Sequence, residues 1–421
     1  MRVGYGKLGR AMPLDPKRWG QVGGDNEAPA LLMTLARRWP EHEFVIIGRN
    51  PGEDPQQLGF PVNVINPWKD MPNAGKEIHK QAGDDLELRT ALLYDRIRPW
   101  VDTMGGIIMW AGQHGTSNQP IPKVGEPGEL TKPQESFINY AGFLIRAIND
   151  WRSRDPFTRR EVWLCADVRN YLKCRDLKYP PMGILAQYDF TKTEKHFRWG
   201  DPMEPWVNEA DIASSAAWSE PDVWIAGHRY HYSRLEIVGI PTDIALDTNF
   251  DRGHFGILIN ENRTYVAKAR KEVMRDWVLP LAPTWMHGKW TDKSLEALGV
   301  DIQPTPYDTI WDKMRSVRTT LTTPASGSGW ATAKPWEAFA VGTVCFFHPN
   351  YDDEGFILAD APSELRQWLR VTSPEDLAAR VAAVNADENL WRWLIGMQRD
   401  HFDHAIREQR CVETIGSWAG L

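Results

Sequence analysis

Short apolar runs alternate with longer amphipathic segments along most of the chain. In the first half, the runs rich in Val, Ile and Trp cover residues 44–48, 62–66, 106–112, 161–167 and 222–228. Such runs are typical of buried strands, and the segments between most of them have the spacing of helices. Strands that alternate with helices form a parallel sheet covered on both faces. We therefore predict an α/β fold that begins with a doubly wound, Rossmann-like domain over residues 1–243, irregular between residues 169 and 221.

The same alternation starts again after residue 243. Apolar runs at 255–260, 283–288, 300–303, 319–324 and 343–347 predict a second Rossmann-like domain over residues 244–389. The tail is helical, with a helix start at Pro374 and an apolar stripe that includes Trp391, Leu394 and Ile395. We expect residues 390–421 to complete the first domain. The predicted architecture is two doubly wound domains that face each other across a cleft.

Composition is that of an ordinary globular protein, with 42% hydrophobic and 25% charged residues in 421. A net charge of -7 argues against wholesale electrostatic binding of nucleic acid but leaves room for a local basic groove. No apolar run approaches the roughly 20 residues of a membrane helix, and no signal-peptide pattern is visible, so we expect a cytoplasmic protein. The four cysteines lack metal-type spacing, which predicts reduced, buried thiols and no tightly bound metal.

Three side chains near predicted strand or helix ends are candidate general bases. His114 follows the run at 106–112, Asp167 ends the run at 161–167, and Asp25 precedes the first helix. The carboxyl ends of parallel strands are where such sheets place their chemistry. Each residue also has a plainer interpretation, a structural hydrogen bond for His114 and a helix or turn cap for the two aspartates. The sequence alone leaves both interpretations open.

Residues 169–199 interleave basic side chains with aromatic rings. Basic groups pair with phosphates, and aromatic rings stack on exposed bases. This segment is the best candidate for binding a nucleic-acid acceptor, although a solvated loop explains the same composition. The candidate acceptor-binding residues are Arg169, Lys173, Arg175, Lys195, Arg198 and Trp199.

Three further segments carry the chemistry of a nucleotide site. Gly23 and Gly24 precede a helix, where small residues let an anion approach the backbone N–H groups. Arg263 and Lys268 supply the positive charge that a diphosphate requires. Glu337 lies among small residues, and its carboxylate can accept both hydroxyls of a ribose. The alternatives are a tight glycine turn and solvated surface charges.

These segments resemble motifs of the GT-B glycosyltransferases, namely a GG-x-E entry, an R-x4-K pair and an E-A-x-A-x-G motif. The resemblance implies that the C-terminal domain holds a UDP- or GDP-sugar and the N-terminal domain holds the acceptor. It also implies that Glu337 binds the ribose, that Arg263 and Lys268 neutralise the diphosphate, and that Lys334 neighbours the donor. The chain departs from the pattern at Gly329, where retaining members usually carry a second Glu. The stereochemical outcome is therefore open.

Segments 20–27 and 245–253 are similar to bacteriophage-encoded glycosyltransferases of modified DNA bases. That resemblance implies a hydroxymethylated pyrimidine in double-stranded phage DNA as the acceptor, and the bacterial host cytoplasm as the location. Two alternatives use the same fold. One is a small-molecule glycosyltransferase or a sugar-nucleotide epimerase, and the other is a non-enzymatic nucleic-acid-binding scaffold.

Overall fold

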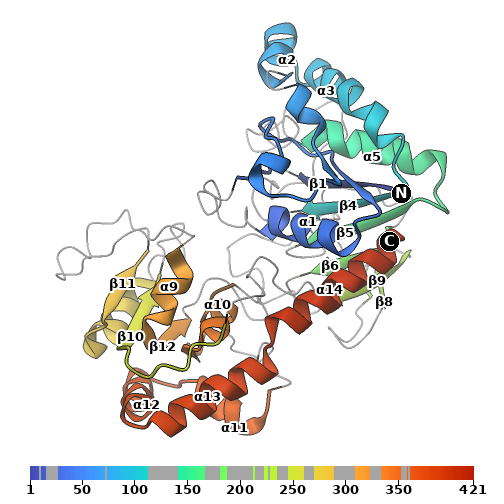
Figure 1. Cartoon of the computed structure of the whole chain (residues 1–421). Coiled ribbons are helices and arrows are strands. Elements are labelled where there is room, and N and C mark those ends of the chain that lie inside the picture. The colour runs from blue at the N-terminus through green and yellow to red at the C-terminus, as the bar shows by residue number, and fades with distance from the viewer. Residues whose placement is uncertain are drawn as a thin grey trace. The chain divides into compact units, whose positions relative to one another are not determined.

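A computed structural model of the chain resolves two compact units (Figure 1). The first unit takes the described residues up to 234 and returns with Gln409–Leu421, and the second takes those from 245 to Glu408. The sequence placed the boundary between the two domains at residue 243, which lies between 234 and 245. It placed the return of the chain to the first domain at residue 390, whereas the structure has it at Gln409. The structure describes residues 1–8, 11–15, 27–71, 74–111, 141–165, 181–186, 212–213, 222–225, 228–234, 245–259, 270–288, 309–322, 333–351, 358 and 361–421.

The first unit is built on one large sheet. Its strand order is β3-β2-β1-β4-β5-β6-β9-β8-β7, with parallel pairing from β3 to β9 and antiparallel pairing of β8 and β7 at the end. The strands are β1 (Arg2–Leu8), β2 (Glu43–Ile46), β3 (Val64–Ile65), β4 (Gly106–Ala111), β5 (Arg160–Cys165), β6 (Gly183–Ala186), β7 (Ile212–Ala213), β8 (Asp222–Ile225) and β9 (His228–Arg234).

The sequence correctly predicted β2 to β5 and β8, but it missed β6, β7 and β9. The region expected to be irregular contains β6, which has only four residues, and β7, which has two. The basic run that follows β8 forms β9, with an alternation of polar and aromatic residues that suits a strand exposed on one face. A hairpin therefore extends the parallel sheet, as often happens at the edge of α/β sheets.

Helices cover both faces of this sheet because its strand order reverses beside β1. The crossover through α1 (Glu27–Arg38) runs from β1 to β2, whereas those leading to β4 and β5 carry α2 (Ala74–Ala82), α3 (Leu86–Val101) and α5 (Phe143–Arg154) in the opposite direction. Right-handed crossovers of opposite direction place their helices on opposite faces. Short turns η2 (Gln56–Leu58) and η3 (Pro67–Asp70) flank β3. The predicted doubly wound order is confirmed.

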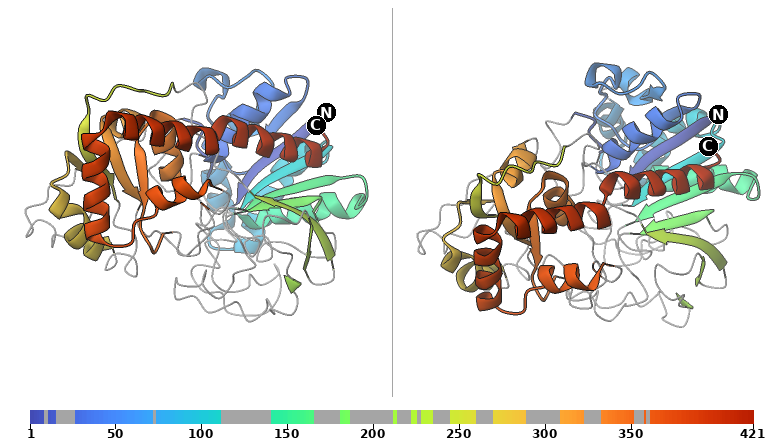
Figure 2. Two further views of the ribbon diagram at one scale, coloured as in Figure 1. Left: turned by 90° about the horizontal axis from the view of Figure 1, so that it is seen from below. Right: turned by 60° about the horizontal axis from the view of Figure 1, so that its bottom comes forward.

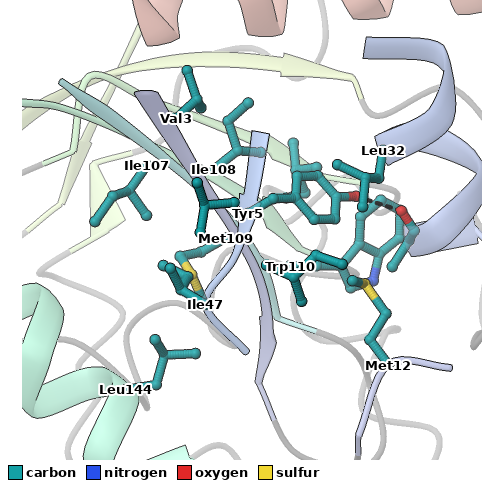
Figure 3. Packing of buried hydrophobic residues seen from close by; sticks show 14 of the residues in the cluster. Val3, Tyr5, Met12, Leu32, Ile47, Ile107, Ile108, Met109, Trp110 and Leu144 are labelled. Carbon is teal, nitrogen blue, oxygen red and sulfur yellow. Dashed lines mark hydrogen bonds between the residues drawn. The ribbon is translucent and has the colours of Figure 1, made fainter. Parts of the chain in front are cut away.

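The core of the first unit lies along β1 and β4 (Figure 3). Both strands are buried on both faces, as the continuous apolar run in β4 predicted. The buried Tyr5 hydroxyl donates to the Ala28 carbonyl at 2.6 Å, which fixes the start of α1 against β1. The carboxyl end of β1 and the beginning of α1 are thus held together.

The C-terminal helix α14 (His404–Ala419) packs against the first sheet through glycines. In Figure 2 its last turns run along the sheet on the side of α1. A Cβ on Gly183 would lie 2.3 Å from the Trp418 ring, and one on Gly416 would lie 2.3 Å from the Trp39 ring. Backbone and indole rings therefore approach closely, and larger side chains at these glycines would separate them.

The second unit has a smaller parallel sheet of order β11-β10-β12-β13. The chain moves from β10 to the edge strand β11 and then back across to β12 and β13, so its crossover helices also lie on both faces. The strands are β10 (Gly253–Leu258), β11 (Trp285–His287), β12 (Val317–Thr322) and β13 (Val344–Phe347). The helical segments are η8 (Met274–Val278), η9 (Leu279–Leu281), α9 (Ile310–Arg315), α10 (Ala333–Val341), α11 (Ser363–Leu369), α12 (Pro374–Ala386) and α13 (Glu388–His401).

The tail helix α12 begins at Pro374, where the sequence predicted. The Ser373 side chain accepts from the backbone N–H of Asp376 at the start of α12, and Asp387 caps α13 in the same way. Trp391, Leu394 and Ile395 are buried. Within the described residues, no helix combines the length and apolar character needed to cross a bilayer.

Candidate functional site at the carboxyl edge of the second sheet

The carboxyl ends of β10, β12 and β13 lie at one edge of the second sheet because these strands are parallel. The register pairs Thr322 of β12 with Phe347 of β13, and β10 ends at Leu258. The helix α10 joins β12 to β13, so its N-terminal end also belongs to this edge. Ligands of open α/β sheets bind at such an edge, where helix N-termini attract anions. This edge is the candidate site.

The position of α10 is fixed at its C-terminal end by a glycine turn. Gly342 has a φ of 78°, and the N–H of Thr343 donates back to the Ala338 carbonyl at 2.9 Å. A Cβ on Gly342 would lie 2.6 Å from the carbonyl oxygen of Asp247. The small residues that flank Glu337 thus serve close packing, as their pattern indicated. They leave α10 with little freedom to shift along the sheet.

Segment 245–253, one of the two that suggested a phage enzyme, has a structural role at this helix. The Arg252 guanidinium donates to the carbonyls of Gly342 at 3.1 Å and Val341 at 3.4 Å, and it pairs with the Asp247 carboxylate at 3.2 Å. Its cation also lies 5.0 Å from the centre of the Trp391 ring. A cation at a helix C-terminus complements the helix dipole. Arg252 therefore anchors α10 from the far side of the site.

Two predicted donor-site residues, Lys334 and Glu337, lie one turn apart on α10. The Lys334 amino group donates to the carbonyl of Leu258, the last residue of β10, at 2.8 Å. Glu337 is 2% exposed, and its negative charge acts on Lys334. Arg270, also 2% exposed, adds a second positive charge near the lysine. Lys334 itself is half-buried, so the edge holds one partly exposed cation beside a buried cation and a buried carboxylate.

Burial changes the protonation of this group of residues. Loss of hydration, and then the positive charge of Arg270, lower the pKa of Lys334 from 10.5 to about 7, against smaller opposite effects of Glu337 and Cys345. Burial raises the pKa of the Cys345 thiol well above its usual value. Lys334 is therefore poised to change charge near neutral pH, whereas Cys345 stays a thiol.

The described cysteines Cys165, Cys345 and Cys411 are buried and free, which confirms the prediction for these three.

On β13 the backbone also binds Gln398, a fully buried residue of α13. Its side-chain oxygen accepts from the N–H of Cys345 at 3.0 Å, and its amide donates to the Thr343 carbonyl at 3.2 Å. Gln398 thereby completes the hydrogen bonds at the start of this strand.

The structure adds His348, which follows β13 directly and which sequence reasoning missed. Its Nδ1 accepts from the N–H of Asn350 at 3.1 Å, and its ring lies 4.4 Å from the Trp277 ring. Burial lowers the pKa of His348 to about 4, so the imidazole is neutral at physiological pH. Its position at a strand end was the available signal. Arg270 was missed as well, because a lone charge in a helical segment suggests a solvated face.

In the first unit, the carboxyl edge carries a buried amide network. The Asn50 side-chain oxygen accepts from the N–H of Glu53 at 2.9 Å and from the Asn66 amide at 2.8 Å, while its own amide donates to the Met12 carbonyl at 2.8 Å. The Glu53 carboxylate accepts from the N–H of Leu14 at 2.7 Å. The network joins the segments that follow β1, β2 and β3.

No family model and no curated protein sequence matches this chain. Solved structures do match it. A structure of the DNA-modifying enzyme beta-glucosyltransferase aligns over 100% of both chains with a TM-score of 0.54 at 9% identity. T4 phage beta-glucosyltransferase in complex with its UDP-glucose substrate aligns over 100% of both chains with a TM-score of 0.53 at 10% identity. HepE from Anabaena, in complex with UDP-glucose, aligns over 99% of this chain and 100% of its own with a TM-score of 0.51 at 10% identity.

The chain has the GT-B fold. This confirms the predicted architecture of two Rossmann-like units. An identity of about one residue in ten shows the fold alone, so the match assigns no side chain. Within this GT-B chain, Lys334 and Glu337 are the predicted site residues that the described part contains, and the structure brings them together with Arg270.

The other predicted site residues lie outside the described residues. They are the candidate bases Asp25, His114 and Asp167, the donor-site residues Gly23, Gly24, Arg263 and Lys268, and the acceptor-binding residues Arg169, Lys173, Arg175, Lys195, Arg198 and Trp199.

Proposed function

We propose that the chain is a glycosyltransferase that moves a sugar from a nucleotide-sugar donor to a hydroxyl acceptor. The observation that carries this proposal is the buried carboxylate of Glu337 beside Lys334 at the carboxyl edge of the second sheet. A buried carboxylate pays a desolvation cost that ribose hydroxyls can offset through two charge-assisted hydrogen bonds. Lys334 and Arg270 provide the positive surroundings that suit a diphosphate.

The donor is a UDP- or GDP-sugar, held by the second unit over residues 244–389. Matched structures of T4 phage beta-glucosyltransferase and of HepE contain UDP-glucose, which supports a uridine nucleotide as the first donor to test. In this proposal Arg263 and Lys268 neutralise the diphosphate and Glu337 binds the ribose. Gly23 and Gly24 offer backbone N–H groups to the donor from residues 1–243.

The acceptor we favour is the hydroxymethyl group of a modified pyrimidine in phage DNA. The full-length likeness to a DNA-modifying enzyme supports it, together with the basic and aromatic residues from Arg169 to Trp199. A base inside a duplex must leave the stack to react, at a cost of a few kcal/mol that stacking on aromatic rings can offset. Activity on phage DNA would place the protein in the bacterial host cytoplasm.

If the reaction inverts the configuration of the anomeric carbon, one side chain must take the proton of the acceptor hydroxyl. Asp25, His114 and Asp167 are the proposed bases, and each carries a group that can accept a proton from an attacking hydroxyl. Gly329 stands where retaining members of the family usually carry a Glu. The configuration of the transferred sugar in the product must therefore show whether the reaction inverts or retains the anomeric carbon. No tightly bound metal is proposed.

A transfer assay distinguishes these functions. The protein is incubated with hydroxymethylated or unmodified duplex DNA and a panel of UDP- and GDP-sugars. Each reaction is run with and without Mn²⁺, since T4 phage beta-glucosyltransferase has been solved with UDP and Mn²⁺. The DNA is then digested to nucleosides for mass spectrometry. We expect a hexose- or pentose-shifted hydroxymethyl nucleoside with one donor.

The alternatives give different products. Hydrolysis or interconversion of a donor without DNA would indicate a small-molecule glycosyltransferase or an epimerase. DNA binding without affinity for any nucleotide would indicate a scaffold. Absence of a mass-shifted nucleoside with every donor would exclude the DNA acceptor.

A further inference from the structure

We propose that Lys334 is a positioning residue of the donor site: through its hydrogen bond to the Leu258 carbonyl and its charge beside Glu337, it sets the arrangement that binds a nucleotide diphosphate. This inference rests on the proposed function. In this role Lys334 acts by holding its protein neighbours in place rather than by contacting the donor sugar. It also predicts that donor affinity depends on pH in a way that one lysine controls.

The geometry places Lys334 between two parts of the site. Its backbone belongs to the first turn of α10, one turn before Glu337, while its amino group reaches the last residue of β10 at 2.8 Å. The lysine therefore ties α10, the helix that carries Glu337, to the carboxyl end of β10.

Charged and titratable groups act on Lys334 from three directions. Arg270 precedes η8 and disfavours a second positive charge, Glu337 on α10 favours it, and Cys345 comes from β13. These influences together with burial give Lys334 a pKa of about 7. The lysine is therefore charged at pH 6 and neutral at pH 8.5. The thiol of Cys345 and the imidazole of His348 keep one state across this range, since their pKa values are raised and lowered out of it.

The charge matters because the ligand is an anion. A protonated Lys334 partly balances Glu337 and lets an anion enter beside the carboxylate, whereas a neutral amine leaves the repulsion between carboxylate and diphosphate less compensated. If binding requires the protonated form, affinity falls about tenfold for each pH unit above the pKa. The dissociation constant should then rise about tenfold between pH 6 and pH 8.

Calorimetric titration of the full chain with UDP-glucose and with GDP-mannose tests the inference. Both ligands carry a diphosphate esterified at each end, which does not titrate between pH 6 and pH 8.5. Four proteins are compared over this range: wild type, Lys334→Met, Lys334→Arg and the control Lys313→Met, whose lysine is exposed on α9. Wild type and the control should lose about tenfold in affinity from pH 6 to pH 8.

Lys334→Met should bind at least about tenfold more weakly than wild type at pH 6 and show no slope with pH, because it copies the neutral lysine. Lys334→Arg keeps its charge, so its affinity should stay flat up to pH 8.5. If one of the two variants fails to fold, the other still tests whether Lys334 causes the pH dependence of affinity. A pH slope in Lys334→Met equal to that of wild type overturns the inference alone, whereas absence of nucleotide binding by wild type at every pH overturns the proposed function as well.

Discussion

Replacing Lys334 by Met should stabilise the second unit at neutral pH, although we expect it to weaken donor binding. Burial is the largest cause that lowers the pKa of Lys334 from 10.5 to about 7. Because the unfolded chain holds this proton more tightly than the folded chain, wild-type stability falls as the pH decreases from about 10.5 to about 7. The penalty is complete at and below pH 7, and methionine removes it.

The size of the effect follows from two opposing contributions. A difference of about 3.5 pKa units corresponds to about 5 kcal/mol. Methionine cannot donate to the Leu258 carbonyl, and that lost hydrogen bond costs about 1–3 kcal/mol. The free energy of unfolding should therefore rise by about 2–4 kcal/mol at pH 7. At pH 10 only about 0.8 kcal/mol of the penalty remains, because the pKa of the unfolded lysine is 10.5, so the variant should be less stable than wild type there by about 0–2 kcal/mol.

Urea unfolding followed by circular dichroism at pH 7 and pH 10 measures both differences. Hydrogen exchange of peptides covering residues 333–347 assigns the transition to the second unit. The control Lys313→Met should lie within about 0.5 kcal/mol of wild type at both pH values, since its side chain is exposed. Destabilisation of Lys334→Met at pH 7, or an equal gain at both pH values, would refute the reasoning about a desolvated charge.

Further variants test packing in both units. Gly183→Val should push the Trp418 ring away and lower stability by about 1–3 kcal/mol, measured by scanning calorimetry; an unchanged melting temperature would mean that α14 does not need this contact. Gly396→Ala is the matched control, because no atom lies within 4 Å of its added Cβ and alanine favours a helix interior by about 1 kcal/mol, so stability should rise. Asn50→Ala should cost about 2–3 kcal/mol and speed hydrogen exchange across residues 47–66, since it removes the acceptor of the Glu53 N–H and one of the two acceptors of the Asn66 amide. Unaltered exchange would contradict that role.

Most of the fold could be predicted because burial dominates the sequence of its central strands. The run at 106–112 became β4, and the run at 343–347 became β13, since strands covered by helices on both faces are apolar throughout. β6 escaped prediction because it lies within a stretch whose basic and aromatic composition indicated a loop, and β9 because it is polar at alternate positions. The contact between Trp418 and Gly183 joins residues far apart in sequence, so no local pattern predicts that these two residues meet.

The candidate site could be predicted only in part. Glu337 stood out because small residues surround it, and the structure shows that these residues are buried. The hydrogen bond from Lys334 to Leu258, the burial of Arg270 and the low pKa of His348 are properties of tertiary packing. A charge that looks solvated in sequence gains its function only when other elements remove its water.

The most direct test of the account is a calorimetric comparison of wild type and Glu337→Gln with two ligands. One is UDP or GDP, whichever the wild type binds, and the other is its 2′,3′-dideoxy analogue. If Glu337 binds the ribose hydroxyls, the substitution should weaken the nucleotide by about 10- to 100-fold, because hydrogen bonds to a charged group contribute about 1.5–3 kcal/mol. It should change affinity for the dideoxy analogue by less than about threefold. Equal losses with both ligands, or none with either, would contradict the assignment of Glu337 to the ribose.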